Sequence, residues 1–212
     1  MPSLTDSFFE RLSAIPLVGV LRGCPVEHVV AIATTAVDSG IGVVEITLDS
    51  PEAVNQIALI SKRLPGTLVG AGTVRSAEQV DVAVQAGARF IVAPGTKLSV
   101  VSRSVALNVP CIPGAATPSE IEYAFDLGAT AVKVFPADQL GGPPYLKALQ
   151  APLRGIPLLP TGGIDASNAA DYLDSGAIAV GVGALVFPAS ALATGNCSTI
   201  ADAIMKLVEA IK

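Results

Sequence analysis

A lysine and a glutamate stand inside short apolar segments of this sequence, where ionisable side chains are unusual. Lys133 lies between two valines in AVKVFPA, and Glu45 lies between Val44 and Ile46 in GVVEITL. Because side chains alternate along a strand, the flanking residues are predicted to face one side and both charged groups the other. A lysine in an apolar site has a lowered pKa and becomes a neutral amine that attacks carbonyl carbons. The pair therefore predicts carbonyl chemistry, with Glu45 as the candidate base.

A structural alternative is that Lys133 and Glu45 form a buried ion pair without chemistry. Other polar groups favour a site, because Arg22 closes the first apolar run, LVGVLR. Two glycine-rich segments, PTGGI (160–164) and GVGA (181–184), follow the seventh and eighth runs. Loops at these ordinal positions form the usual phosphate site of parallel barrels, where backbone N–H groups meet an anion at a helix N-terminus. GAGTV (70–74) is a further loop that could face the same site.

The elements that must position these groups are short β-branched runs with helical segments between them. The runs begin near residues 17, 42, 68, 89, 110, 130, 157 and 177, and the clearest helical patterns span 26–40, 51–64, 76–88, 118–129 and 165–177. Ser50-Pro51, Thr117-Pro118 and Asp165 are predicted to open three of these helices. Alternating strands and helices predict a parallel sheet. We predict an α/β fold, a single (βα)8 TIM barrel over residues 1–212 with a short helix near residues 4–13. An open doubly wound sheet is the alternative, although the first loop lacks the GxGxxG of its dinucleotide-binding form.

Composition excludes several classes of protein. Apolar residues make up 51% of the 212, the mean hydropathy is +0.61 and the net charge is −5. Such a chain is too apolar for disorder and lacks the basic footprint of nucleic-acid or anionic-membrane binding. A single histidine rules out a multi-histidine metal site, and cysteines without a CxxC pair indicate a reducing compartment. With no signal peptide and no long apolar run, we expect a soluble, cytoplasmic protein. Packing or loop and cap roles are assigned to the remaining conspicuous side chains: His28, Cys24, Cys111, Cys197, Tyr123, Phe125, Asp138 and Asp165.

Six motifs together resemble the KDPG/KHG aldolase family, in order and over essentially the whole chain. They are VLRG, VEITL, GAGTV, PGAATP (113–118), VKVFPA and PTGGI. The resemblance implies a class I pyruvate aldolase on a TIM barrel. Its reaction would cleave 2-keto-3-deoxy-6-phosphogluconate (KDPG) to pyruvate and glyceraldehyde 3-phosphate, as in Entner–Doudoroff carbohydrate metabolism. It further implies a cytosolic homotrimer without metal or other cofactor, whose partners are small 2-keto acids.

The same resemblance assigns roles to individual residues. It implies that Lys133 forms the Schiff base, that Glu45 is the general acid and base, and that Arg22 binds the substrate carboxylate. The other implied binding residues line the pyruvate or substrate site (Thr73, Pro94, Pro113 and Phe135) or the phosphate site (Thr161, Gly162, Gly163, Gly183 and Ala184).

Two departures from the family pattern leave the substrate open. Asp49 in ITLDS replaces an arginine that some members carry in VTLRT, and Ala184 replaces a serine found in many. Each removes a donor to an anion. Substrates without a phosphate therefore stay open, namely 4-hydroxy-2-oxoglutarate (KHG) and oxaloacetate, which the same lysine would decarboxylate. The galactonate-derived epimer of KDPG also stays open, because the sequence does not resolve the configuration at C4. Outside this class stand a phosphosugar isomerase or epimerase and a non-catalytic phosphometabolite-binding protein.

Overall fold

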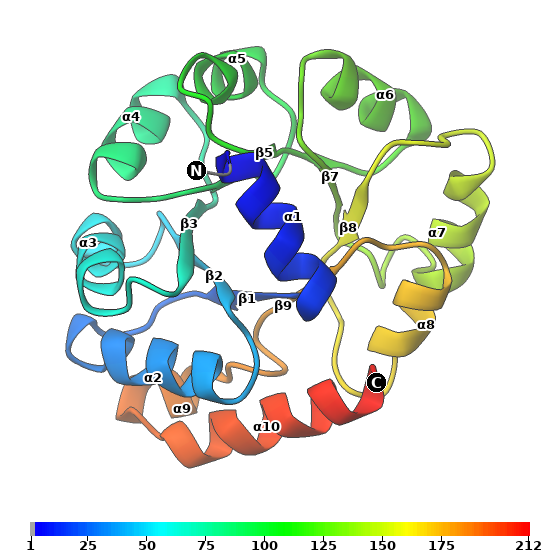
Figure 1. Ribbon diagram of the computed structural model, residues 1–212. Helices are drawn as coiled ribbons and strands as arrows, with labels where there is room; N and C mark the ends of the chain where they lie inside the picture. The colour runs from blue at the N-terminus through cyan, green and yellow to red at the C-terminus, as the bar shows by residue number, and fades with distance from the viewer. Residues whose placement is uncertain (1–2) are drawn as a thin grey trace.

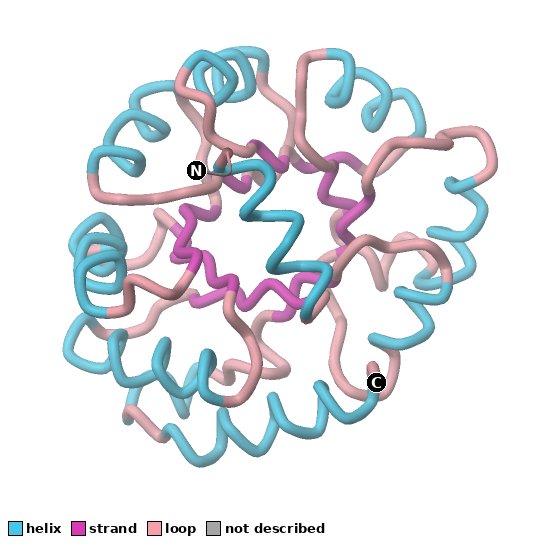
Figure 2. The backbone as a smooth tube through the Cα atoms, in the orientation of Figure 1, coloured by secondary structure: helices cyan, strands magenta, loops and turns pink. Residues whose placement is uncertain are grey.

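The strands form a ring that is surrounded by the helices, except for the N-terminal helix, which lies across one end of the ring (Figures 1 and 2). The computed structural model describes residues 3–212, and every strand pairing in this part of the chain is parallel. The strands are β1 (Leu17–Leu21), β2 (Val43–Thr47), β3 (Leu68–Gly72), β4 (Ile91–Val92), β5 (Cys111–Ile112), β6 (Gly114–Ala115), β7 (Val132–Val134), β8 (Leu158–Pro160) and β9 (Val180–Val182).

Two short connections complete the ring. One series of paired strands runs β5-β4-β3-β2-β1-β9 and a second runs β6-β7-β8. β5 and β6 belong to one predicted run and are separated by Pro113, which has no N–H to give to a ladder. An isolated parallel bridge between Thr161 and Gly181 joins the end of β8 to β9. The predicted barrel of eight runs is therefore confirmed, and the open doubly wound alternative is wrong.

Helices alternate with the strands around the outside of the ring. The predicted N-terminal helix is confirmed, and it begins with a capping box between Ser3 and Asp6. The helices of residues 3–212 are α1 (Leu4–Ala14), α2 (Val26–Asp38), α3 (Ala53–Arg63), α4 (Ala77–Gln85), α5 (Leu98–Ala106), α6 (Pro118–Asp126), α7 (Gly142–Gln150), α8 (Ala169–Asp174), α9 (Ala189–Thr194) and α10 (Cys197–Ala210).

Of the three predicted helix starts, one is confirmed and two are wrong. Thr117 caps α6, and Glu120 completes a capping box there. Ser50 opens no helix, because its hydroxyl instead accepts the Gly23 N–H, and α3 begins at Ala53. Asp165 lies in a turn in which it binds Ser167, and α8 begins at Ala169.

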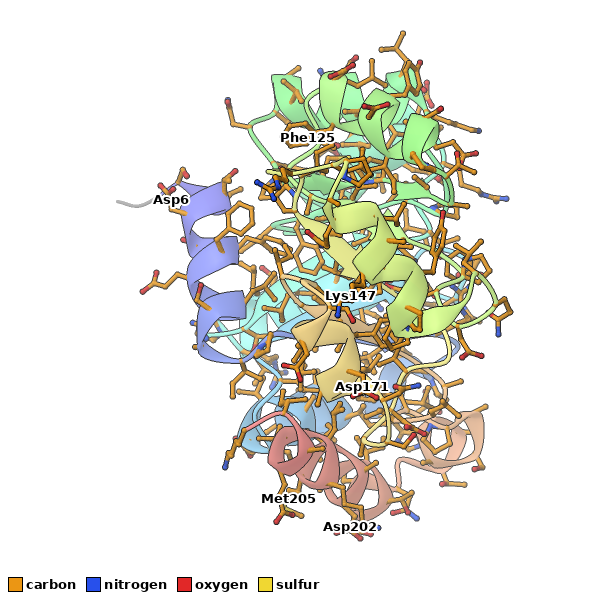
Figure 3. The ribbon with its side chains drawn as sticks, turned by 90° about the vertical axis from the view of Figure 1, so that its right-hand side faces the viewer. Asp6, Phe125, Lys147, Asp171, Asp202 and Met205 are labelled. Carbon is orange, nitrogen blue, oxygen red and sulfur yellow. The ribbon has the colours of Figure 1, made fainter. Side chains whose placement is uncertain are left out.

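Helix α1 covers one end of the barrel, as the view along the barrel and the side view both show (Figures 1 and 3). The Phe8 ring lies 5.3 Å from the Phe90 ring, centroid to centroid, and packs with Val18 and Leu68 near the starts of their strands. This end is closed by apolar packing. The carboxyl ends of the strands lie at the other end, which is where barrels of this type place their sites.

Strand residues divide between two apolar clusters by alternation. Val44, Ile46, Val132 and Val134 belong to the larger cluster, which the strands share with the surrounding helices. Val18, Val43 and Leu159 belong to the smaller cluster inside the ring. None of the helices within residues 3–212 combines the length and hydropathy needed to span a bilayer.

Candidate active site

Lys133 stands on the inner face of β7, between two valines that face the helix layer. Its backbone N–H donates to the Pro113 carbonyl (2.9 Å), which fixes this strand against its neighbour. The side chain is 8% exposed, and Nζ lies 4.8 Å from the centroid of the Phe135 ring. Burial lowers the pKa of Lys133; the Glu45 carboxylate opposes that shift and the Arg22 charge adds to it. The amine therefore loses its proton more readily than the amine of an exposed lysine.

Glu45 stands on the inner face of β2 and is 2% exposed. Burial raises the pKa of its carboxyl group, while the positive charges of Lys133 and Arg22 act in the opposite direction. The carboxyl group lies against Gly72, where an added Cβ would come within 2.5 Å of Oε1. Among residues 3–212, the salt bridges are Arg22–Asp49 and Arg103–Asp81, so Lys133 and Glu45 are coupled by charge without forming a structural ion pair.

Side chains from three successive loops contact one another at the open end of the barrel. Arg22 follows β1, Asp49 follows β2 and Thr73 follows β3. The Arg22 guanidinium forms an ion pair with Asp49 through Nη1 and donates from Nη2 to the Thr73 hydroxyl (3.1 Å). Thr73 has a φ of 58°, a left-handed conformation that is uncommon for a β-branched residue and is typical of functional sites.

A cavity of about 380 Å³ opens above the lysine at this end. Ten of the twelve predicted site residues line it: Arg22, Thr73, Pro94, Lys133, Phe135, Thr161, Gly162, Gly163, Gly183 and Ala184. Glu45 and Pro113 do not. Glu45 lines a small space deeper in the barrel, next to Val20 and Thr161, which border both spaces.

The prediction missed three apolar lining residues, Val20, Ile164 and Leu185. Alternation could have found Val20, because it stands two residues before Arg22 and therefore faces the same side. The side chains of Ile164 and Leu185 come from loops, where no periodic signal exists. Pro113 remains a neighbour of the site, since its carbonyl holds the backbone of Lys133.

Residues of both glycine-rich loops line this cavity. Gly162 and Gly163 have φ values of 103° and 74°, and a Cβ on Gly163 would lie 2.5 Å from that of Asp138. Within residues 3–212, the N–H groups of Gly163, Gly183 and Ala184 have no hydrogen-bond acceptor. The helices after the two loops begin only at Ala169 and Ala189. The predicted helix N-termini are therefore not at the loops, and the cavity is lined instead by loop residues whose N–H groups are free.

The residues expected to have packing roles divide into two groups. Burial raises the pKa of Cys24 and Cys111 to about 11, so both are unreactive thiols, and His28 packs against Gly195 away from the cavity. Tyr123 and Phe125 contradict the expectation, being 50% and 37% exposed on the outer surface of α6. In the described part of the chain, no group of three or more histidine, cysteine or acidic residues could hold a metal ion.

Comparisons with known proteins agree on one family. Residues 9–203 match the model of the KDPG and KHG aldolase family. The chain is 38% identical over 191 residues to the 2-dehydro-3-deoxy-phosphogluconate aldolase of Treponema pallidum, covering 90% of each protein. It is 35% identical over 201 residues to the KHG/KDPG aldolase of Escherichia coli, covering 95% of this chain and 94% of that protein.

A solved structure is similar over nearly its whole length. The KDPG aldolase of Legionella pneumophila, with pyruvate captured as a covalent carbinolamine intermediate, superposes with a TM-score of 0.87 and is 32% identical. The match covers 94% of this chain and 97% of the Legionella chain.

Proposed function

Because the chain belongs to the KDPG and KHG aldolase family, we propose that it cleaves KDPG to pyruvate and glyceraldehyde 3-phosphate, with Lys133 as the Schiff-base residue. The chain is a class I aldolase, a carbon–carbon lyase. One observation carries the assignment of Lys133. It is a buried amine on the inner face of the barrel that lines the cavity, has a lowered pKa and lacks a salt bridge among the described residues.

Lys133 begins the reaction by attacking the C2 ketone of the substrate. The amine adds to the carbonyl carbon as a carbinolamine, which loses water to give an iminium. Once a base removes the C4 hydroxyl proton, the C3–C4 bond breaks and its electron pair moves into the iminium, giving an enamine of pyruvate. The aldehyde leaves as glyceraldehyde 3-phosphate. Protonation at C3 and hydrolysis of the iminium then release pyruvate and restore the amine.

Glu45 is the base we assign to both proton transfers. Its carboxyl group lies on the inner face of β2 beneath the cavity, where a raised pKa brings it closer to neutral pH and makes it a better base. Because Glu45 does not line the main cavity, a water molecule would carry the proton between the carboxylate and the substrate. A positioned base contributes about 10²–10⁴-fold to such a step.

The two ends of the substrate would be held by different groups among the residues that line the cavity. Arg22 would bind the C1 carboxylate with charge-assisted hydrogen bonds, beside the Thr73 hydroxyl. The free N–H groups of Gly163, Gly183 and Ala184 would receive the phosphate. Since Ala184 offers no hydroxyl, Thr161 is the one assigned side chain that could add a donor to these backbone N–H groups, and this favours KHG as a second substrate.

Reduction with borohydride in the presence of pyruvate tests the proposal. The wild-type protein should gain the mass of one reduced pyruvate adduct, located on Lys133 by peptide mapping. Lys133→Ala should lose both the adduct and pyruvate release from KDPG. Lys147→Ala is the matched control, because Lys147 is exposed on the outside of the barrel, on α7 (Figure 3).

The remaining outcomes separate the alternatives. A non-covalent isomerase or a silent binding protein would show no adduct, and an adduct on another lysine would refute the assignment.

As further parts of the proposal, residues 1–212 form one aldolase domain that assembles as a homotrimer in the cytoplasm and acts in Entner–Doudoroff metabolism. Met1 and Pro2 lie outside the described residues.

A further inference from the structure

Asp49 holds the carboxylate-binding arginine from outside the cavity. Arg22 and Thr73 line the cavity, whereas Asp49 does not. The Asp49 carboxylate pairs with Nη1 of Arg22, and the Thr73 hydroxyl accepts from Nη2 at 3.1 Å. The Arg22 side chain is 55% exposed, so without these two contacts little would fix it at the mouth.

The contacts leave the guanidinium able to bind an anion. A guanidinium has five N–H donors, so most of them stay free after the bonds to Asp49 and Thr73. The negative charge of Asp49 has a second effect, because it offsets the positive charge of Arg22 and repels an incoming carboxylate. Holding the guanidinium and reducing its attraction for anions are separable effects of one side chain.

We propose that Asp49 is a positioning residue that orients Arg22 over the cavity while setting a weak affinity for the carboxylate of the 2-keto acid. The inference rests on the proposed function and deepens it. A weak carboxylate site lets pyruvate leave readily, so that the product inhibits the enzyme little. Substitution of the charge alone should therefore tighten pyruvate binding.

Three variants separate the two effects. Asp49→Asn keeps an oxygen that accepts the Arg22 hydrogen bond and removes the charge, whereas Asp49→Ala removes both. Asp81→Asn is the matched control, because Asp81 forms the other surface ion pair, with Arg103 at 2.6 Å, on the outer helices. The readouts are the pyruvate concentration that half-saturates borohydride trapping, the inhibition constant of pyruvate, and kcat for KDPG cleavage.

For Asp49→Asn, both pyruvate constants should fall about 3- to 10-fold, as expected from loss of one partly exposed charge. Asp49→Ala should lower kcat, because Arg22 is no longer held. Asp81→Asn should change neither the two pyruvate constants nor kcat.

The pH dependence of trapping gives a second readout that a structural role would not move. Lys133 is faced by Glu45 from β2 and by Arg22 from the end of β1. In Asp49→Asn, the Arg22 charge acts on Lys133 without an opposing carboxylate. The pH midpoint of iminium formation should therefore shift to lower pH.

The outcomes distinguish this inference from the proposed function. If the wild type traps pyruvate on Lys133 but Asp49→Asn leaves the half-saturating concentration unchanged or raises it, the inference about Asp49 is wrong and the aldolase assignment stands. If the wild type traps no pyruvate, the proposed function fails and the inference fails with it.

Discussion

Replacing Lys133 with methionine should stabilise the fold. At neutral pH the folded protein holds this amine in an apolar site, at a free-energy cost from burying the charge or removing the proton. Methionine has a similar length and carries no such cost. Replacing buried charges by apolar side chains of similar volume commonly gains about 1–4 kcal/mol. We expect about 2 kcal/mol for Lys133→Met at pH 7, which corresponds to ~4–8 °C in Tm for a chain of this size.

This gain should depend on pH in a defined direction. The pKa of Lys133 is lowered in the folded protein from its ordinary value of 10.5. Between the lowered pKa of the folded protein and the ordinary pKa of the unfolded chain, Lys133 is protonated in the unfolded chain and neutral in the folded protein. The free energy of unfolding of the wild type therefore rises with pH in this range, by at most about 1.4 kcal/mol per pH unit. The advantage of the methionine variant should therefore be largest below the folded pKa and should shrink as the pH approaches 10.5.

Urea unfolding at pH 7 and pH 10 measures both effects. Lys147→Met provides the control, because this exposed lysine should show a difference from wild type that is small and similar at the two pH values. Replacing the lysine also deprives the Glu45 carboxylate of a nearby positive charge. The double variant Lys133→Met/Glu45→Gln removes both charges and therefore corrects for that loss. A Lys133→Met protein less stable than wild type at pH 7 would show that the lysine stabilises the fold and would refute this reasoning.

The remaining predictions concern proton transfer and the phosphate loop. Glu45→Gln keeps the shape of the side chain and removes the base, so KDPG cleavage should fall about 10²-fold or more while borohydride trapping of pyruvate persists. Deuterium exchange of the pyruvate methyl group, followed by NMR, should fall in parallel, and undiminished exchange would remove Glu45 from the mechanism. Gly72→Ala places a Cβ within 2.5 Å of Glu45 Oε1 and must displace the carboxylate, so cleavage should drop ~10–100-fold with trapping retained. Ala184→Ser adds a hydroxyl donor, and KM for KDPG should fall roughly five- to tenfold with little change for KHG, since a hydrogen bond to a charged group contributes about 1–1.5 kcal/mol net. Equal changes in both KM values, or none, would contradict the phosphate assignment.

Alternation along strands explains why the catalytic pair could be predicted from the sequence. Two valines flank Lys133, and Val44 and Ile46 flank Glu45; all four belong to the cluster that the strands share with the helices. The charged residues between them must then face the interior of the ring. The barrel could be predicted for a similar reason, because the runs recur at intervals that fit one strand and one helix each.

Helices α5 and α7, which lack a capping signal, were not predicted. Helix α7 begins with Gly142 followed by two prolines, a sequence typical of a turn, and its N-cap Gly141 makes no side-chain hydrogen bond. Helix α5 is rich in serine and valine, and the side chain of its N-cap, Lys97, does not cap the helix but donates from Nζ to the Arg75 carbonyl (3.1 Å). In both cases packing against the barrel decides the structure.

The Asp49–Arg22 pair shows a different limit. Each residue follows its own strand, and the sequence predicts only that both lie at the same end of the barrel. Whether the acid faces the substrate or the arginine depends on the course of two loops. Tyr123 shows the same limit on a helix, because its aromatic character predicts packing while its place on α6 leaves it half exposed.

Closure of the ring through β9 has a consequence for how the chain folds during synthesis. Leu17 of β1 pairs with Val180 of β9, so the first strand made by the ribosome waits for the last one before its second edge is covered. Contacts between such distant residues carry a large loop-closure entropy and slow folding. Until β9 emerges, the edges of β1 and β8 stay unpaired in the nascent chain, and such edges are templates for association with other chains. A chain truncated before Val180 should therefore aggregate rather than form a stable half-barrel, and its solubility on expression measures this directly.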